Sequence, residues 1–281
     1  MLASVDAMQA AMDATSGGPC FTVADIADIH RRVMAQAPNR HIAGKVRTVQ
    51  NWIGGNDYNP CGADFVPPPP DHVQGLLEDL MDAVNREDLP PLVQAAVVHA
   101  QFETIHPFED GNGRTGRALI QVVLRRRGIA ASYVPPISVI LAAERDAYFA
   151  GLGEFRFGDP VRWIARVAEA AARAATLARQ FVDPVRELQD EWHRLRAAAA
   201  NPRADAAAWA LIDALPARPV ISTAGAIALT SRAKSAIHAA VGQLEGAGVL
   251  IPLSASRRNR LWEVLGLLDL VQGLDAGRAL R

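Results

Sequence analysis

The spacing of hydrophobic residues along the chain predicts a mostly helical protein. Residues 71–86 are the clearest case, because Val73, Leu77, Leu80 and Val84 recur every three or four positions and would share one face of a helix. The same spacing predicts helices over residues 3–14, from Thr22 to about Ala35, and over 92–105, 137–153 and 159–200, the last with a break near Asp183-Pro184. The expected fold class is therefore mostly α, a helical bundle.

Residues 45–66 have a different pattern. Apolar residues lead up to Trp52, Gly54-Gly55-Asn56 follow as a turn, and a polar loop then leads to Asp64-Phe65-Val66. This order is typical of two short strands joined as a β-hairpin. Pro67–Pro70 should end the second strand, because proline has no N–H to donate to a sheet.

The end of the chain, residues 203–281, follows a third pattern after a boundary at Asn201-Pro202. It predicts helix, strand, helix, helix and two strands, in that order, over 205–215, 220–222, 223–229, 231–246, 249–253 and 261–265. Such an order is typical of a winged helix-turn-helix domain. The start of its third helix, at 231–246, would be the recognition helix and would carry Ser231, Arg232, Lys234 and Ser235, where base contacts occur in such domains.

Two functions are open for this C-terminal domain. Residues 218–262 contain six basic side chains and one acidic one, Glu245, which favours DNA. The six basic residues include Arg257, Arg258 and Arg260 in the predicted wing. Related modules also serve in dimerisation and protein contact, so a homodimer is the alternative.

Composition narrows the class of protein. The chain has 281 residues, half of them hydrophobic, and can bury a sizeable core in one or two domains. Its net charge of −1 gives no global field for nucleic acid, and the basic run at residues 125–127 is expected to be a solvated helix end. Two cysteines, Cys20 and Cys61, do not make a disulfide scaffold or a metal cluster.

Localisation is predicted from what the sequence does not contain. No apolar run approaches the roughly 18 residues of a membrane span, and residues 1–16 lack the basic start and apolar core of a signal peptide. We therefore expect a cytoplasmic protein without a membrane partner.

The chemistry is concentrated in residues 106–117, His-Pro-Phe-Glu-Asp-Gly-Asn-Gly-Arg-Thr-Gly-Arg. Gly111 and Gly113 allow successive N–H groups to turn towards one point, and the helix that begins there adds the positive end of its dipole. Arg114 and Arg117 are three apart, so both can project from one face to bind phosphate.

Two further groups complete this set. Asp110 offers a hard oxygen ligand, and Mg²⁺ is usually bound by one or two carboxylates together with substrate phosphates. His106 can take up a proton near neutral pH. Taken singly, these residues are typical of a helix end, a turn and a solvated face. Their joint spacing instead predicts a nucleoside triphosphate held by its phosphates and a metal, with a base beside it.

Residues 106–117 match the HPFx[D/E]GNGRxxR signature, so the chain resembles the Fic family. The resemblance covers roughly residues 20–182, within a catalytic part that we place at residues 1–200 with an N-terminal helix. It implies an α-helical fold and transfer of AMP from ATP to a Ser, Thr or Tyr hydroxyl of a target protein. In this family the matching histidine, His106, is the general base, and the matching acid, Asp110, binds Mg²⁺.

The resemblance also implies how ATP is held. Asn112 and the loop amides at Gly111 and Gly113 bind the α- and β-phosphates, Arg114 grips the phosphates, and Arg117 pairs with the γ-phosphate. Tyr148 corresponds to a tyrosine near the adenine, although a core aromatic is an equal interpretation. We interpret His30, His99 and Glu103 as structural.

The hairpin at residues 45–66 resembles the flap of Fic proteins, which covers the active site and aligns the target's backbone as an added strand. We refer to these residues as the flap. On this basis Asp64, Phe65 and Val66 are the candidates for target positioning.

One absence bears on regulation. Many Fic enzymes contain a [S/T]xxxE[G/N] helix whose glutamate pairs with the second motif arginine, here Arg117, and blocks the γ-phosphate. No Ser or Thr of this chain is followed by Glu four residues later. The glutamate is therefore supplied in trans by an inhibitory partner, lies upstream of this start, or is missing.

Alternatives to AMP transfer stay open. The same fold could use another nucleotide donor or catalyse the reverse, de-AMPylating reaction. A DNA- or protein-binding regulator with a vestigial site is the third interpretation, and the intact motif argues against it.

Overall fold

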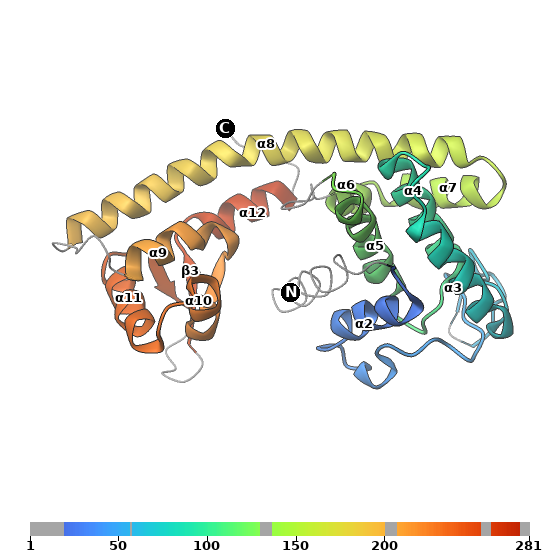
Figure 1. The fold of residues 1–281 in the computed structure, drawn as a ribbon, viewed down its shortest axis with the longest axis horizontal. Helices are drawn as coiled ribbons and strands as arrows, with labels where there is room; N and C mark the ends of the chain where they lie inside the picture. The colour runs from blue at the N-terminus through green and yellow to red at the C-terminus, as the bar shows by residue number, and fades with distance from the viewer. Residues whose placement is uncertain (1–19, 57, 130–136, 200–206, 254–259, 276–281) are drawn as a thin grey trace. The chain divides into compact units, whose positions relative to one another are not determined.

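The computed structural model describes residues 20–56, 58–129, 137–199, 207–253 and 260–275. The chain divides into two compact units, Met1–Ala174 and Ala175–Arg281 (Figure 1). The predicted mostly α fold class is confirmed: helices dominate, and the one sheet of the described residues has three strands. The predicted helix at 3–14 and the wing residues Arg257 and Arg258 lie outside the described residues.

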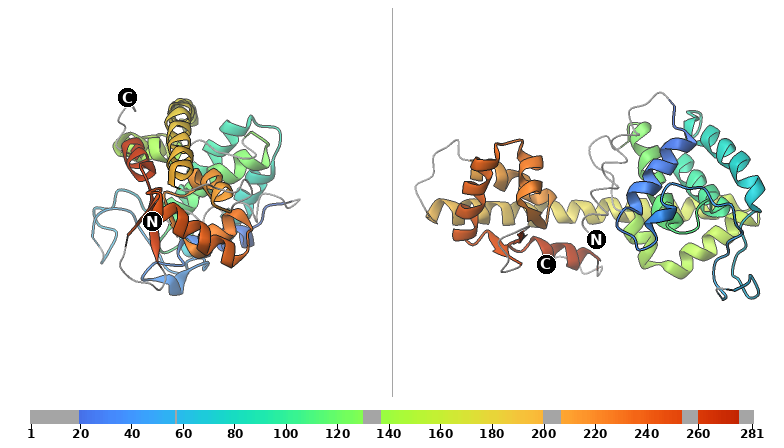
Figure 2. Two further views of the ribbon diagram at one scale, coloured as in Figure 1. Left: turned by 90° about the vertical axis from the view of Figure 1, so that its left-hand side faces the viewer. Right: turned by 90° about the horizontal axis from the view of Figure 1, so that it is seen from below.

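The first unit is built around α4 (Pro91–Ile105), which contacts α3 (Pro70–Asn85), α5 (Asn112–Arg126) and α7 (Arg145–Arg156). Its buried residues lie on every side of the helix, and several are alanines, so neighbouring helices can approach closely. Pro91 opens it at a position where a missing N–H costs nothing. The helix α2 (Val23–Val33) packs against α3 and α5 (Figure 2), and α6 (Ile137–Ala143) packs against α7.

The start of α2 is closed by its own side chains, at the position where the predicted helix begins. The Thr22 side chain accepts the Asp25 N–H, and the Asp25 carboxylate accepts the Thr22 N–H, which completes a capping box. The buried residues Ile26, Ile29 and Val33 form the expected apolar face. A short 3₁₀ turn, η1 (Arg40–Ile42), then leads into the flap.

The prediction of two strands in the flap is wrong in extent. The hairpin is reduced to one antiparallel bridge, in which the Ile53 N–H donates to the Phe65 carbonyl (2.9 Å) and the Phe65 N–H donates to the Ile53 carbonyl (3.2 Å). Gly54 and Gly55 both have positive φ, and the prolines that start at Pro67 cannot donate, so the ladder cannot extend on either side.

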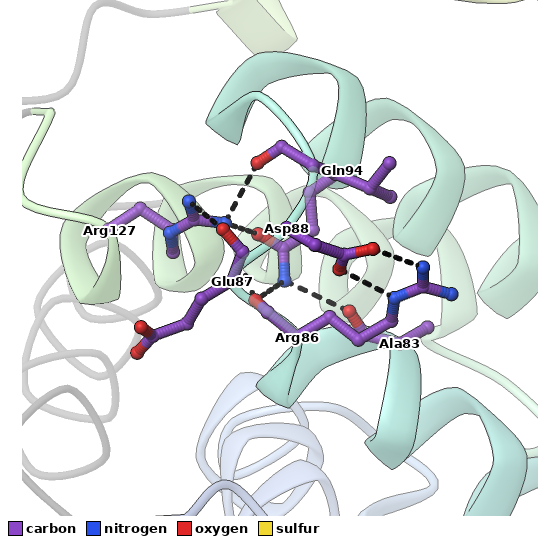
Figure 3. Close-up of polar contacts among 7 residues, drawn as sticks. Ala83, Arg86, Glu87, Asp88, Gln94 and Arg127 are labelled. Carbon is purple, nitrogen blue, oxygen red and sulfur yellow. Dashed lines mark hydrogen bonds and ion pairs between the residues drawn. The ribbon is translucent and has the colours of Figure 1, made fainter.

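The connection between α3 and α4 is fixed by one buried amide (Figure 3). The Gln94 Nε2 group donates to the carbonyls of Ala83, Val84 and Arg86, and Gln94 Oε1 accepts from Arg127 at 2.6 Å. Arg127 also donates to the carbonyls of Arg86, Glu87 and Leu89. The expectation of a solvated helix end is therefore wrong for Arg127, because the carbonyls at the end of α3 compete with water for its guanidinium.

The predicted break in the helix at Asp183-Pro184 is also wrong, because α8 (Pro160–Ala199) runs through Pro184. Proline removes one backbone hydrogen bond, and side-chain packing on both sides holds the helix together. Trp163 and Val167 are fully buried in the first unit, whereas Trp192 belongs to the core of the second.

The second unit surrounds a small antiparallel sheet with the strand order β1-β3-β2. Its elements follow the predicted order: α9 (Ala207–Ala214), η2 (Leu215–Ala217), β1 (Val220–Ser222), α10 (Thr223–Thr230), α11 (Lys234–Gly246), β2 (Leu250–Pro252), β3 (Leu261–Val264) and α12 (Leu267–Asp275). The helix α11 packs on α9 and β2, and Trp192 of α8 donates to the Leu265 carbonyl at 3.0 Å. No helix of the described residues combines the length and hydropathy that a membrane span needs.

The role of Gln94 leads to a stability prediction. Gln94→Ala should lower the free energy of unfolding by about 2–3 kcal/mol, because it removes the donor of buried carbonyls at Ala83 and Val84 and one acceptor of the Arg127 guanidinium. Urea unfolding measures this loss. Gln74→Ala, which removes only an exposed contact to Glu78, is the control and should change stability by less than about 0.5 kcal/mol. Equal effects of the two changes would contradict the role of Gln94.

Candidate functional site

The loop between α4 and α5 carries the first half of the motif, and it begins with an unusual backbone. His106 follows α4 in a left-handed conformation (φ 48°, ψ 60°), and its N–H donates to the Phe102 carbonyl at 2.9 Å. This region is uncommon for residues other than glycine, and at functional sites it is maintained by the surrounding structure. We refer to residues 106–111 as the motif loop.

The group that holds this conformation is Arg47, at the start of the flap. Only 2% of Arg47 is exposed, and its guanidinium donates to the carbonyls of His106 (2.9 Å) and Ile105 (3.3 Å). It also donates to the carbonyls of Val49 (3.1 Å) and Pro68 (2.6 Å), which lie at the two ends of the flap. Burial lowers the pKa of Arg47. One side chain thus ties the flap to the motif loop.

Two more flap residues, Asn51 and Gln50, hold the base of the flap in place. The Asn51 Nδ2 group donates to the Phe108 carbonyl at 3.0 Å and, more weakly, to the His106 carbonyl at 3.4 Å. The Gln50 side chain donates to the Pro67 carbonyl at 2.9 Å. The base of the flap is therefore anchored by side chains. Farther out, the two arms are joined by the Ile53–Phe65 bridge and by the Asp64 N–H, which donates to the Ile53 carbonyl at 2.8 Å, and the Asn56 side chain closes the turn beyond them.

The interior of the motif loop is closed by Phe108 and Asn112. Phe108 is fully buried, and its ring stacks on the His30 imidazole with 3.8 Å between centroids. The Asn112 Oδ1 atom accepts the Phe108 N–H (2.9 Å), and Asn112 Nδ2 donates to the Phe108 carbonyl (2.7 Å). The Asn112 amide therefore shapes the loop, and it can act on a phosphate only through the backbone that it arranges.

His30 supports the loop from α2. The Gly44 N–H donates to His30 Nδ1 (2.8 Å), so the proton of the neutral ring lies on Nε2, which donates to the Asp110 carbonyl (2.8 Å). Burial is the main reason why the pKa of His30 is lowered. A Cβ at Gly111, where φ is 79°, would lie 2.8 Å from Met34 Sδ and 3.0 Å from His30 Nε2. Glycine is needed there for both reasons.

Asp110 presents an ionised carboxylate at the surface of the loop. Asn39 Nδ2 donates to its Oδ2 at 2.9 Å, the Gly111 N–H donates to Oδ1 at 2.5 Å, and an Arg114 nitrogen lies 3.9 Å away. The hydrogen bond from Asn39 is the main cause that holds the pKa of Asp110 below its usual value. About half of the side chain is exposed, so it suits a Mg²⁺ ion that also binds phosphate.

The start of α5 offers unused donors. Gly111 is its N-cap, and no side chain caps this end, so the first N–H groups of the helix are available to an anion. Arg114 from the first turn contacts Met34 Sδ at 3.1 Å. The Arg117 guanidinium forms no hydrogen bond or ion pair with the described part of the chain, and it lines a cavity together with Tyr148. These are the features of a phosphate site.

Tyr148 forms one wall of this cavity, between α5, α6 and α7. Its ring packs near Trp163 and Phe149, and its hydroxyl lies 3.0 Å from His99 Nε2. Burial raises the pKa of Tyr148 far above its usual value. Tyr148 is therefore a buried aromatic that also borders the cavity, and its place near an adenine stays a prediction.

His106 is neutral over the physiological range. Burial is the main reason why its pKa falls to about 4, and the charges of Arg47 and Arg156 add to the effect. The Glu103 carbonyl and Asp110 act in the opposite direction. A neutral imidazole next to a bound phosphate can accept a proton from a hydroxyl group.

Glu103 lies beneath the phosphate site. It is 5% exposed, and its Oε1 atom would be 2.4 Å from a Cβ at residue 116, so the motif needs Gly116 there. Burial raises the pKa of Glu103 to about 7, while Arg117 and Arg156 act to lower it. This carboxyl is therefore close to half protonated at neutral pH.

The three flap residues predicted to position a target differ in exposure. Phe65 is half-buried and paired with Ile53, whereas Asp64 and Val66 are exposed. No backbone hydrogen bond of Val66 occurs within the described ranges of the chain. The sequence did not single out Arg47 or Arg156 for this site. Arg47 lies between Val46 and Thr48 with Lys45 two residues before it, so its neighbours in the sequence did not mark it as a buried residue.

Known proteins share this part of the sequence. Residues 20–124 match the family model described as Fic/DOC family. The chain is 36% identical over 158 residues to the protein adenylyltransferase fic-1 of Caenorhabditis elegans, covering 54% of this chain and 28% of that protein. It is 34% identical over 155 residues to the protein adenylyltransferase Fic of Nematostella vectensis, covering 53% and 33%. The chain thus spans a third or less of the length of these relatives.

Two solved structures share the fold. A Fic family protein from Desulfovibrio desulfuricans G20 has a TM-score of 0.53 at 20% identity, covering 94% of this chain and 74% of that chain. A Fic domain containing signaling protein from Bacteroides thetaiotaomicron has a TM-score of 0.51 at 24% identity, covering 63% and 70%. At these identities the likeness concerns the fold alone.

The pKa of His106 leads to a prediction about acid stability. The folded pKa of about 4 lies below the unfolded value of 6.5, so the unfolded chain takes up the proton first as the pH falls. Stability tied to the neutral ring is intact above pH 6.5 and is lost between pH 6.5 and about 4. His106→Asn, which keeps a residue that tolerates left-handed backbone, should remove about 2 kcal/mol of the stability loss between pH 7.5 and pH 5.

Urea unfolding of both proteins at the two pH values measures this difference. Glu103 titrates with the opposite sign, because its pKa is raised on folding, but it is present in both proteins and cancels in the comparison. An unchanged pH dependence in His106→Asn would show that the imidazole is not held neutral by the fold.

Proposed function

The chain carries a Fic/DOC family domain over residues 20–124, and from this premise we propose that it transfers AMP from ATP to a hydroxyl side chain of a target protein. One observation carries the proposal. A single loop and the helix after it bring together a neutral, half-buried imidazole (His106), an ionised carboxylate (Asp110) and a guanidinium without a described partner (Arg117). This is the set that phosphoryl chemistry with a base requires.

In this reaction His106 acts as the general base. Its imidazole takes the proton of the Ser, Thr or Tyr hydroxyl while the oxygen attacks the α-phosphorus of ATP. The bond between the α-phosphorus and the bridging oxygen breaks, and pyrophosphate leaves. The products are the AMP-modified side chain, pyrophosphate and a protonated His106, which returns its proton to solvent.

ATP would be held by the start of α5. The free N–H groups after Gly111, including that of Gly113, bind the α- and β-phosphates, and Asn112 supports them by fixing the loop. Arg114 and Arg117 bind phosphate oxygens, Arg117 at the γ-phosphate. The cavity beside Tyr148 would receive the adenine.

Asp110 fits Mg²⁺, because its carboxylate is ionised, half exposed and next to the phosphate donors. A bound Mg²⁺ would offset charge on the phosphates of ATP. The outer edge of the flap, with Asp64, Phe65 and Val66, would align the target's backbone as an added strand beside His106.

We further propose that the chain has two domains, a catalytic part at residues 1–200 and a winged helix-turn-helix domain at 203–281. The order β1-α10-α11-β2-β3 supports the second assignment, and a three-residue turn with Ser231 in a left-handed conformation joins α10 to α11. Residues Arg232, Lys234 and Ser235 are exposed at the start of α11, which favours DNA as a partner.

Another contact weighs against DNA. The Arg260 guanidinium pairs with the Glu245 carboxylate at 3.0 Å, so this wing arginine is engaged within the domain. Dimerisation or docking to a protein stays the alternative for this domain. For regulation, the described residues leave Arg117 open, so an inhibitory glutamate supplied in trans would have a place to bind.

The first test of the activity concerns the base. His106→Asn should reduce AMP transfer by about 10²–10⁴-fold and leave ATP affinity nearly unchanged, because the phosphate donors lie elsewhere in the loop. Intact-mass spectrometry after incubation with MgATP reports the added AMP, and calorimetry reports ATP binding. His72→Asn, at an exposed position of α3, is the matched control. Equal losses of rate and affinity would make His106 a nucleotide-binding residue.

The second test concerns the metal and the donor. Transfer should stop in EDTA and return with Mg²⁺, and Asp110→Asn should need a much higher Mg²⁺ concentration, because the neutral amide is a poorer ligand. Glu109→Gln, the exposed neighbour, is the control. Full activity in EDTA would exclude the metal role of Asp110. Transfer from labelled GTP, CTP or UTP in preference to ATP would favour another donor.

A further inference from the structure

The outer part of the flap needs a support that its backbone does not provide. Within the described residues, its two arms are joined by one bridge, between Ile53 and Phe65, and by one further backbone hydrogen bond, from the Asp64 N–H to the Ile53 carbonyl. Short two-stranded ribbons are marginal on their own. Arg47, Gln50 and Asn51 hold only the base of the flap. Something else must fix Phe65, where the candidate recognition edge lies.

Arg156, at the end of α7, contacts Phe65 directly. Its guanidinium carbon lies 3.5 Å from the centroid of the Phe65 ring, which is a close cation–π contact. This is the shortest of the five such contacts described, which otherwise range from 5.5 to 6.0 Å. The half-buried position strengthens the contact, because less water competes for the cation.

The same guanidinium also holds the end of α4. Arg156 Nε donates to Thr104 Oγ1 and Nη2 donates to the Glu103 carbonyl, both at 3.3 Å. Thr104 in turn donates to the Ala100 carbonyl at 2.7 Å. These acceptors belong to the last turn before His106. One side chain therefore touches both the recognition edge of the flap and the helix end that carries the base.

We propose that Arg156 is a positioning residue that sets the distance between the target strand on the flap and His106. The functional part of this inference rests on the proposed AMP transfer. The contact between Arg156 and Phe65, which we call the latch, can be tested without it. If Phe65 loses its contact with Arg156, the base of the flap stays anchored, but the position of its outer edge relative to His106 is no longer fixed. A target hydroxyl would then meet the base less often, while the phosphate site would be unaffected.

Hydrogen exchange of the full-length chain tests the latch directly. The amides of Ile53 and Phe65 form the bridge, so Arg156→Ala and Phe65→Leu should each speed their exchange about tenfold. Amides of α5 should not change. In the Phe65→Leu background, Arg156→Ala should have no further effect, and Phe65→Tyr, which keeps the ring, should retain the protection. Arg162→Ala, an exposed arginine of α8, is the control. Unchanged exchange in both Arg156→Ala and Phe65→Leu would overturn the latch.

A partition experiment separates positioning from general damage. With α-labelled ATP, AMP can be transferred to protein or to water, and the second reaction needs no aligned target. Arg156→Ala should lower the ratio of protein-bound to free AMP about tenfold and leave the rate of free-AMP formation and the ATP affinity within about twofold. An equal fall of both products would show a structural role only. If no AMP is formed by any variant while the exchange results hold, the proposed function fails and the latch stands.

Discussion

The Arg47 guanidinium is withdrawn from water and donates to carbonyl oxygens on the flap and at the end of α4. A buried cation without an ionic partner is costly unless its donors are satisfied, and here the acceptors are backbone groups that also need partners. The guanidinium and these carbonyls all find hydrogen-bond partners only when the flap and the motif loop keep the relative position that the structure shows. The left-handed backbone of His106 and the low pKa of its imidazole both depend on this arrangement.

In the rest of the site, neutral side chains are also separated from charged ones. His30, His99 and His106 are all neutral because they are buried, whereas Asp110 and Arg114 remain charged at the surface of the loop. The charged ligands of a nucleotide therefore face outwards, and the proton acceptor lies behind them in a medium of lower polarity. A bound triphosphate would bring negative charge close to His106 and raise its affinity for a proton, in the direction that general base catalysis needs.

Local chemistry made the helices and the motif predictable. The apolar stripe of α3, the Thr22–Asp25 cap and the glycine at position 111 each follow from short-range rules, and each occurs as expected. The failures all concern competition with distant partners. Pro184 does not end α8, and Val185 and Leu188 just after it pack against the core of the second unit. Arg127 is not fully solvated, because carbonyls of the loop after α3 bind it.

Arg47 and Arg156 were missed for a related reason. Their partners are mainly backbone carbonyls, a hydroxyl and a ring face, which leave no complementary charge in the sequence to signal them. The motif records which groups meet the nucleotide, because those groups are close together in the chain. The two residues that fix the position of the flap are far from His106 in the sequence: Arg47 lies 59 positions before it and Arg156 lies 50 positions after it. Arg47, His106 and Arg156 meet at the C-terminal end of α4, because the folded helix brings them together. How a target hydroxyl is placed beside His106 is therefore a property of the fold and not of the motif.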